Sequence, residues 1–327
     1  MNLDMIRAAR ARLQGRVRRT PLLSSPFLDA LAQRKVYVKA ECLQHTGSFK
    51  FRGAWSALSA LDAQARKRGV LAYSSGNHAQ GIAAAAAAHQ VHAVIVMPQN
   101  APRLKQENTR ALGADLVLYD PAGEEDRESI GLALAQERGL TLIKPYDNAQ
   151  VIAGQGTLGL ELAEQAQANR IDAADVLVCC GGGGLTAGMA LALHSVARGL
   201  RVRPCEPEGF DDTARSLAAG RVVANAAGAA SLCDAIITAA PGHMTFPIMQ
   251  RLCGPGLVVS DAEALYAVAQ AFMRLKIVVE PGGAVALAAA LRRQGQITGD
   301  AVIVVCTGGN IDPQMFVQAL EVPPLPA

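Results

Sequence analysis

Residues 176–198 read VLVCCGGGGLTAGMALALHSVAR, and this stretch contains the pattern that decides the fold. A short apolar run, typical of a strand buried on both faces, leads directly into four consecutive glycines. The Ala- and Leu-rich residues that follow predict a helix over 185–198. A strand that passes through a glycine loop into a helix is the repeating element of parallel sheets.

The same alternation of short apolar runs and longer helical stretches extends along most of the chain. Further strands are predicted at 36–39, 70–74, 93–97, 114–119, 141–144 and 301–306. Helices are predicted at 51–61, 80–89, 102–112, 126–138, 156–167 and 261–276. We therefore expect an α/β protein, with mostly parallel sheet flanked by helices.

Composition excludes several classes of protein. The chain has 327 residues, of which 50% are hydrophobic and 18% charged, which is incompatible with intrinsic disorder. No apolar run approaches the roughly 18 residues that a membrane-spanning helix needs. The net charge of +3 is too small to indicate a nucleic-acid-binding surface. We expect about two domains and neither a membrane nor a nucleic-acid partner.

Cysteine usage indicates a reducing compartment. The seven cysteines are odd in number and include no CxxC pair, so buried free thiols are favoured over disulfides or a zinc site. Basic residues near the N-terminus are followed by no apolar segment of the kind that a secretory signal contains. A cytoplasmic location is expected.

The glycine loop is suited to binding a phosphate group. Gly181, Gly182, Gly183 and Gly184 let backbone N–H groups converge, and the helix that starts at Leu185 adds partial positive charge. The loop has neither a Walker lysine nor the G-x-G-x-x-G spacing, which disfavours a nucleoside triphosphate or a dinucleotide. The alternative is a tight turn without a ligand.

A second segment, HTGSFKFRGA at 45–54, places a lysine between two aromatic residues. Desolvation by Phe49 and Phe51 would lower the pKa of Lys50 and free its amine as a nucleophile. The alternative is a lysine whose side chain merely extends along a helix surface.

Two more segments follow predicted strands. SSGNHAQG at 74–81 offers hydroxyl, amide and free N–H groups at a helix start, which suit a carboxylate. TGGNID at 307–312 ends the last strand with Thr307 and two glycines. Taken alone, the first is a good helix cap and the second is only a turn.

Together, in this order, these four segments resemble the fold type II family of pyridoxal-phosphate (PLP) enzymes. Within that family the chain resembles the threonine/serine dehydratase and serine racemase branch. The resemblance runs from about residue 20 to residue 311 and includes VIAGQGT at 151–157 and VEPGGA at 279–284. It implies a large PLP-binding domain from 1–46 and 148–327, and an inserted small domain from 47–147 that contributes the lysine.

The resemblance also implies roles for individual residues. Lys50 would carry the cofactor as a Schiff base and take the substrate's Cα proton. The four glycines and Leu185 would hold the cofactor phosphate, with Phe49 beside its ring, Asn77 on its phenolic oxygen and Thr307 at its pyridine nitrogen. The substrate carboxylate would be held by Ser75, Gly76, Asn77 and His78.

The implied reaction is dehydration of L-threonine or L-serine to a 2-oxo acid and ammonia. A neutral Thr307 hydroxyl leaves the pyridine nitrogen largely unprotonated, which favours prompt loss of a β-leaving group. Three alternatives stay open. Ser75 matches the second acid/base of family members that racemise serine, and Arg127 matches a residue near the substrate side chain, which permits 3-hydroxyaspartate. Another, bulkier β-hydroxy amino acid also stays open as the substrate.

The resemblance further implies a homodimer and a divalent cation. Glu206, Asp212 and the carbonyl of Phe210 match a cation-binding segment, and oxygen ligands suit Mg²⁺. A solvated acidic loop is the alternative. A non-catalytic ligand sensor and a Rossmann-type oxidoreductase compete with the enzyme hypothesis as a whole, and Lys50 between aromatic residues argues against both.

Overall fold

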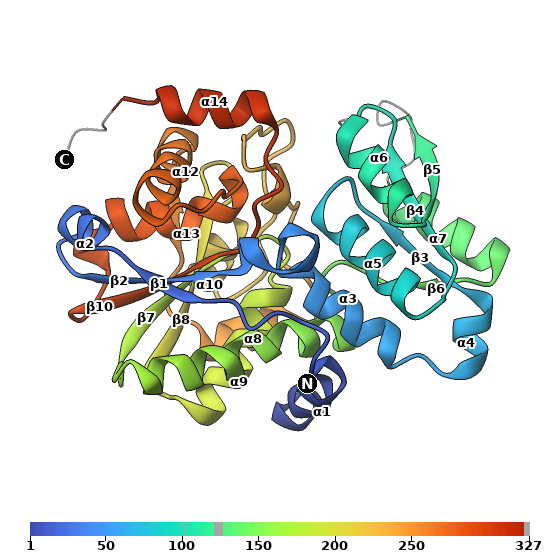
Figure 1. The fold of residues 1–327 in the computed structure, drawn as a ribbon, viewed down its shortest axis with the longest axis horizontal. Helices are drawn as coiled ribbons and strands as arrows, with labels where there is room; N and C mark the ends of the chain where they lie inside the picture. The colour runs from blue at the N-terminus through green and yellow to red at the C-terminus, as the bar shows by residue number, and fades with distance from the viewer. Residues whose placement is uncertain (102, 121–126, 324–327) are drawn as a thin grey trace.

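Two separate β-sheets organise the chain in this computed structural model, which describes residues 1–101, 103–120 and 127–323. Figure 1 shows the smaller sheet with α3 to α7 around it on one side, and the larger sheet with the remaining helices on the other. The predicted class, α/β with mainly parallel sheets between helices, is confirmed. The predicted boundaries of the two domains, at residues 47 and 148, stay predictions.

The larger sheet has six strands in the order β1-β2-β10-β7-β8-β9. Its neighbours pair in parallel, except that β1 and β2 are antiparallel. The strands are β1 Leu22–Ser24, β2 Lys35–Ala40, β7 Ala174–Cys179, β8 Leu200–Pro207, β9 Leu257–Val259 and β10 Ala301–Cys306.

The smaller sheet has four strands in the order β5-β4-β3-β6, all parallel. These strands are β3 Val70–Tyr73, β4 Ala93–Pro98, β5 Asp115–Tyr119 and β6 Thr141–Leu142. Residues of β3 and β4 alternate between one apolar cluster that contains α3 and α5 and another that contains α7. Both faces of this sheet are therefore covered, as parallel strands require.

Helices enclose the larger sheet in the same way. One face of β2, β7 and β10 packs against α12 and α13, and the other face of β7 and β10 packs against α8 and α9. The helices are α1 Leu3–Leu13, α2 Pro26–Ala32, α3 Lys50–Ser59, α4 Ala63–Arg68, α5 Asn77–Ala88, α6 Arg103–Ala111, α7 Arg127–Arg138, α8 Ala149–Ala168, α9 Gly184–Val196, α10 Asp212–Ala219, α11 Phe246–Leu252, α12 Asp261–Leu275, α13 Pro281–Arg292 and α14 Pro313–Glu321.

Strand β8 was not predicted from the sequence, because Pro204 and Pro207 interrupt it. Pro204 lies opposite Val178 of β7, and the pairing of β8 with β9 begins one residue later, at Cys205. The N–H group that Pro204 lacks would point toward the β9 side, where no strand residue is paired with it. Pro207 lies beyond the last residue of β7, and the same argument applies there. A strand can therefore hold both prolines where the neighbouring strands are too short to need their donors.

Helix boundaries also differ from the sequence predictions. The helix expected at 156–167 begins at Ala149, because the Asn148 side chain accepts hydrogen bonds from the N–H groups of Gln150 and Val151 and caps it. Residues 102 and 126, expected to start two helices, lie outside the described residues. Among the helices described, none combines the length and apolarity that crossing a bilayer requires.

Candidate active site

One cleft collects the carboxyl ends of strands from both sheets, which is where open parallel sheets bind ligands. All four segments singled out in the sequence contribute to its lining. The side of the cleft nearest the larger sheet, the large-sheet side, is formed by Cys179–Thr186, Asp234–Thr238, Glu280 and Thr307. The opposite side, the small-sheet side, is formed by Phe49, Lys50, Tyr73–His78, Lys105, Arg127, Pro145 and Tyr146.

Lys50 is the first residue of α3, and its amine lies inside the cleft. Its Nζ donates to the carbonyl oxygen of Pro145 at 3.3 Å and lies 5.2 Å from the centre of the Phe49 ring. Burial, aided by the charge of Arg127, lowers the pKa of Lys50 to about 8, and Glu280 opposes the shift. An appreciable share of the amine is therefore uncharged near neutral pH and available as a base or nucleophile.

The two phenylalanines beside Lys50 lie in different surroundings, one in the cleft and the other in the apolar core. Phe49 lines the cleft next to the amine. Phe51 packs instead against His45 at 5.1 Å and Trp55 at 5.7 Å between ring centres, in the core beside the smaller sheet. The expectation that both rings desolvate Lys50 is thus wrong for Phe51, since adjacent helical residues point about 100° apart.

The glycine loop joins β7 to α9 and presents backbone to the cleft. Gly183 has φ of +86° as the residue preceding the helix, a conformation that favours glycine. At Gly182 a Cβ would overlap the ring of Tyr146, so only glycine allows that ring to lie against the loop. The helix N-terminus and unobstructed backbone form a cradle that fits a phosphate group.

On the small-sheet side, the loop after β3 turns into α5. The hydroxyl of Ser74 accepts from the N–H of Gly76 at 3.2 Å, and Ser75 lines the cleft. Asn77 donates to Glu280 at 2.5 Å and accepts from Asn310 at 2.7 Å, which links this loop to the large-sheet side. The loop thus offers a hydroxyl and a helix N-terminus, groups suited to an anion.

His78 is buried and neutral. Desolvation, with the charge of Lys50, lowers the pKa of His78 to about 3. Its Nε2 lies 3.0 Å from the carbonyl oxygen of Ile143, so Nε2 carries the proton. Because Nδ1 of His78 has no hydrogen-bond partner among the described residues, this ring nitrogen is left as an acceptor.

Thr307 closes the large-sheet side at the end of β10. Its carbonyl accepts from the N–H of Phe49 at 3.0 Å, which joins the segment before Lys50 to this strand. Its side chain lines the cleft with Cys179, whose thiol donates to the carbonyl of Gly283 at 3.4 Å and whose pKa burial raises to about 11. Thr307 therefore presents a neutral hydroxyl beside a neutral thiol.

Arg127 is the first residue of α7 and an exposed cation on the small-sheet side. Its charge acts on Lys50 and also on Tyr146, whose pKa is raised by burial and held back by Arg127. The adjacent Glu128 pairs with Lys144 at 2.5 Å. The cleft thus has a guanidinium at its outer edge, opposite the glycine loop.

Glu280 is the functional candidate that sequence reasoning missed. It is buried, it lines the cleft, and burial raises its pKa to about 7. The motif around it was part of the family resemblance, but a single glutamate before Pro281 is typical of a helix start. Its position in the lining of the cleft and its contact with Asn77 identify it as part of the site.

The three residues expected to bind a cation lie outside the cleft: Glu206 is on β8, Phe210 is in the loop that follows it, and Asp212 is the first residue of α10. Glu206 is fully buried and accepts from the N–H groups of Thr213 at 2.9 Å and Ala214 at 2.7 Å. Burial, together with the charge of Asp212, raises its pKa to about 8. Both carboxylates are held close enough to repel one another, which a cation would relieve.

Asp212 has one oxygen available to such a cation. Burial raises the pKa of Asp212 to about 6, and its Oδ1 accepts from Asn225 at 2.6 Å. Its Oδ2 is buried and has no hydrogen-bond partner in the described part of the chain. Among the described residues no group of three His, Cys, Asp or Glu side chains is arranged to hold a metal ion, so further ligands would have to be carbonyls such as that of Phe210, or water.

Comparison with known proteins is consistent with these features. The family model described as pyridoxal-phosphate dependent enzyme matches residues 13–308. The chain is 44% identical to the L-threo-3-hydroxyaspartate ammonia-lyase of a Pseudomonas species, over 97% of this chain and 98% of that protein.

Solved structures show the same similarity. Maize serine racemase superposes with a TM-score of 0.90 at 37% identity, covering 98% of this chain and 96% of that one. The serine racemase of Dictyostelium discoideum superposes with a TM-score of 0.88 at 35% identity, covering 95% of this chain and 99% of that one.

Proposed function

This chain belongs to the pyridoxal-phosphate dependent enzymes of fold type II, and on that premise we propose that it is an ammonia-lyase for a β-hydroxy amino acid with a second carboxylate, such as L-threo-3-hydroxyaspartate. The observation that carries the substrate class is the position of Arg127 in the same cleft as Lys50.

The residues of the cleft fit the cofactor. A lysine of lowered pKa and a glycine cradle occupy one cavity, which matches a group that has both an aldehyde and a phosphate. Lys50 would hold it covalently, the glycine loop and Leu185 would hold its phosphate, and Phe49, Asn77 and Thr307 would border its ring. When bound, the cofactor withdraws electrons from the amino acid and so acidifies the Cα–H bond.

Within this site Lys50 is the base. Its Nζ takes the Cα proton, and the Cβ–O bond breaks as the hydroxyl leaves with a proton as water. The released enamine tautomerises to an imine, and water hydrolyses it to the 2-oxo acid and ammonia. Water is consumed and released once each, so the net change is one amino acid to one 2-oxo acid plus ammonia.

The loop after β3 would orient the substrate. Ser75 and the N-terminus of α5 present donors to the α-carboxylate, on the side of the cleft where Lys50 lies. Arg127 would then bind the carboxylate on Cβ by paired charge-assisted hydrogen bonds. Serine and threonine have no group for this guanidinium, which is why the proposal favours the dicarboxylate over the L-threonine or L-serine expected from the sequence.

Exchange of Arg127 tests the substrate class. Arg127→Gln should lower kcat/KM for L-threo-3-hydroxyaspartate about 100-fold, because a charged hydrogen-bonding partner is lost. The kcat/KM for L-serine should change less than about threefold. Arg138→Gln, at the other end of α7, is the matched control and should change neither. Equal losses for both substrates would show that Arg127 serves the site generally and does not select the side chain.

A second activity, racemisation of serine, is favoured by one observation. Ser75 lines the cleft together with Lys50, so a hydroxyl is available as a second proton donor. The weak acidity of a serine hydroxyl makes this a side reaction in our proposal. The divalent cation, the homodimer and the cytoplasmic location stay predictions from the sequence.

A further inference from the structure

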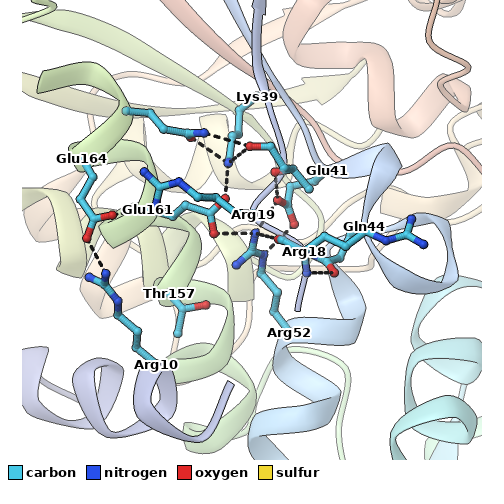
Figure 2. A network of polar contacts seen from close by, with 12 residues as sticks. Arg10, Arg18, Arg19, Lys39, Glu41, Gln44, Arg52, Thr157, Glu161 and Glu164 are labelled. Atoms are coloured by element: carbon cyan, nitrogen blue, oxygen red, sulfur yellow. Dashed lines mark hydrogen bonds and ion pairs between the residues drawn. The ribbon is translucent and has the colours of Figure 1, made fainter. Parts of the chain in front are cut away.

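Four charged side chains are buried together behind the first turn of α3, as Figure 2 shows. Lys39 and Glu41 are 0% exposed, Arg52 is 1% exposed and Glu161 is 9% exposed. The group contains two cations and two anions, so it is neutral as a whole. Because an unpaired buried charge is strongly unfavourable, each member depends on the others.

Arg52 makes the most directional contacts in this cluster. Its Nε donates to Oε2 of Glu41 at 2.7 Å and its Nη2 donates to Oε1 at 2.8 Å, a two-pronged contact of the guanidinium with one carboxylate. Nη2 also donates to Glu161 at 3.1 Å. Burial acts to raise the pKa of Glu41, yet Arg52 and Lys39 hold it below its ordinary value, so the carboxylate is charged.

The other members belong to elements around the larger sheet. Lys39 lies on β2, Glu41 follows that strand, and Glu161 lies on α8. Lys39 in turn donates to Glu161 at 2.5 Å and to the carbonyl of Thr20 at 2.7 Å. Arg52 is the member that comes from α3, the helix that begins with Lys50. The cluster therefore attaches this helix to the larger sheet.

Lys50 and Arg52 point to opposite sides of α3. Two residues along a helix correspond to a rotation of about 200°, so when Arg52 faces the cluster Lys50 faces the cleft. The distance between α3 and α8 is set by a different contact, at Gly154. A Cβ at Gly154 would lie 2.6 Å from the carbonyl oxygen of Arg52, so the two helices touch backbone to backbone.

We propose that Arg52 is a positioning residue for Lys50: its two-pronged contact with Glu41 and its bond to Glu161 fix the rotation of the first turn of α3 and thereby hold the Lys50 amine in the cleft. The inference rests on the proposed role of Lys50 and not on the proposed substrate. Lys50 owes its lowered pKa first to burial. A first turn that can rotate would expose the amine to water and return that pKa toward 10.5.

A buried pair elsewhere in the larger sheet provides the matched control. Arg203 and Asp175 form an ion pair of 3.0 Å, with side chains 6% and 2% exposed. Asp175 lies near the amino end of β7, whereas the cleft lies beyond the carboxyl end. Loss of this pair should destabilise the protein without changing the pKa of Lys50 or the hydrogen exchange around it.

The test compares the full-length variants Arg52→Lys, Arg52→Met and Arg203→Met. In cofactor-free protein, acetic anhydride labelling of Lys50 is followed against pH by mass spectrometry, below the unfolding temperature of every variant. In cofactor-loaded protein, amide hydrogen exchange is measured over residues 49–55. Neither readout uses a substrate, so failure of the proposed activity leaves the result intact.

Both Arg52 variants should raise the apparent pKa of Lys50 by about half a unit or more, which lowers the labelling rate about twofold near pH 8 and about threefold near pH 7. Exchange at 49–55 should be about fivefold faster or more. Arg203→Met should move neither. If Arg52→Met does not fold, Arg52→Lys decides, since a lysine keeps the charge but lacks the planar two-pronged geometry. A labelling curve of Arg52→Lys that overlays the wild type, or an equal shift in Arg203→Met, would overturn the proposal.

Discussion

The two sides of the cleft are made of different chemical groups. The large-sheet side offers backbone in the glycine loop after β7, together with the side chains of Glu280 and Thr307, and it rests on strands that are almost wholly buried. The small-sheet side offers side chains, among them Lys50, Ser75 and Arg127. Its outer strand β5 and the start of α7 are partly exposed.

This difference suggests a division of labour. Backbone groups on a buried strand–helix junction hold a constant ligand, such as a phosphate, in one place. Side chains on the less buried side carry the proton transfer and meet the variable part of the substrate. Substitutions should therefore affect cofactor binding on the large-sheet side, and turnover or selectivity on the small-sheet side.

The largest effect is expected at Lys50. Lys50→Ala should lower turnover about 1,000-fold or more and remove the visible absorbance of the cofactor adduct, because the base and the point of attachment are lost together. The fold should persist, as the circular dichroism spectrum can show. Lys144→Ala, which removes a lysine paired with Glu128, should keep the absorbance. Turnover above background in Lys50→Ala would show that the base is not Lys50 and does not lie on the small-sheet side.

The glycine loop tests the opposite side. Gly183→Ala places a Cβ 2.6 Å from Cε of Met249 on a residue with φ of +86°. We expect the dissociation constant of the cofactor to rise about 5- to 30-fold, as measured by absorbance titration, from a strain of about 1–2 kcal/mol.

Gly220→Ala is the control for the glycine loop, because Gly220 has φ of +71° but lies at the end of α10, away from the cleft. It should destabilise the protein and leave cofactor affinity unchanged. If both variants weaken cofactor binding equally, general destabilisation and not the cradle explains the result.

Ser75 separates elimination from racemisation on the small-sheet side. Ser75→Ala should abolish racemisation of serine, because no proton donor remains for the face of the substrate opposite Lys50. Dehydration of L-substrates should stay within about tenfold of the wild-type rate, a barrier change of about 1.4 kcal/mol. Chiral analysis of serine beside a 2-oxo acid assay measures both. Ser74→Ala is the neighbouring control. Racemisation that survives in Ser75→Ala would limit this residue to carboxylate binding.

The smallest effect is expected at the carboxylate pair of Glu206 and Asp212. Their raised pKa values mean that the folded protein retains protons which the unfolded chain loses, so stability declines as pH rises from 3.8, the ordinary pKa of Asp212, to about 8, the pKa of Glu206 in the folded protein. Millimolar Mg²⁺ should raise the unfolding temperature by about 2–5 °C, and more at pH 8.5 than at pH 7, since binding competes with protonation of Glu206.

Asp212→Asn should lose this response to Mg²⁺. Asp211→Asn, which alters the neighbour paired with Arg215 at 3.0 Å, should retain it. An unchanged response in Asp212→Asn would place any cation elsewhere.

Most of the architecture was accessible from the sequence, with specific exceptions. The strands of both sheets that alternate with long helices were predicted, because each is a compact apolar run between turn residues. Strand β8 was not, since Pro204 and Pro207 read as breaks until the lengths of the neighbouring strands are known. The short β9 has three residues and carries little periodic signal.

By itself the sequence determined the α/β class, the glycine loop and the lysine, because each is encoded in adjacent residues whose chemistry is local. Only the tertiary structure decided which distant residues serve that lysine. Glu280 reaches Asn77 across 203 positions, and Arg52 meets Glu161 across 109. A buried charge is tolerable only beside its partner, and that pairing is a property of packing in space which no single stretch of sequence contains.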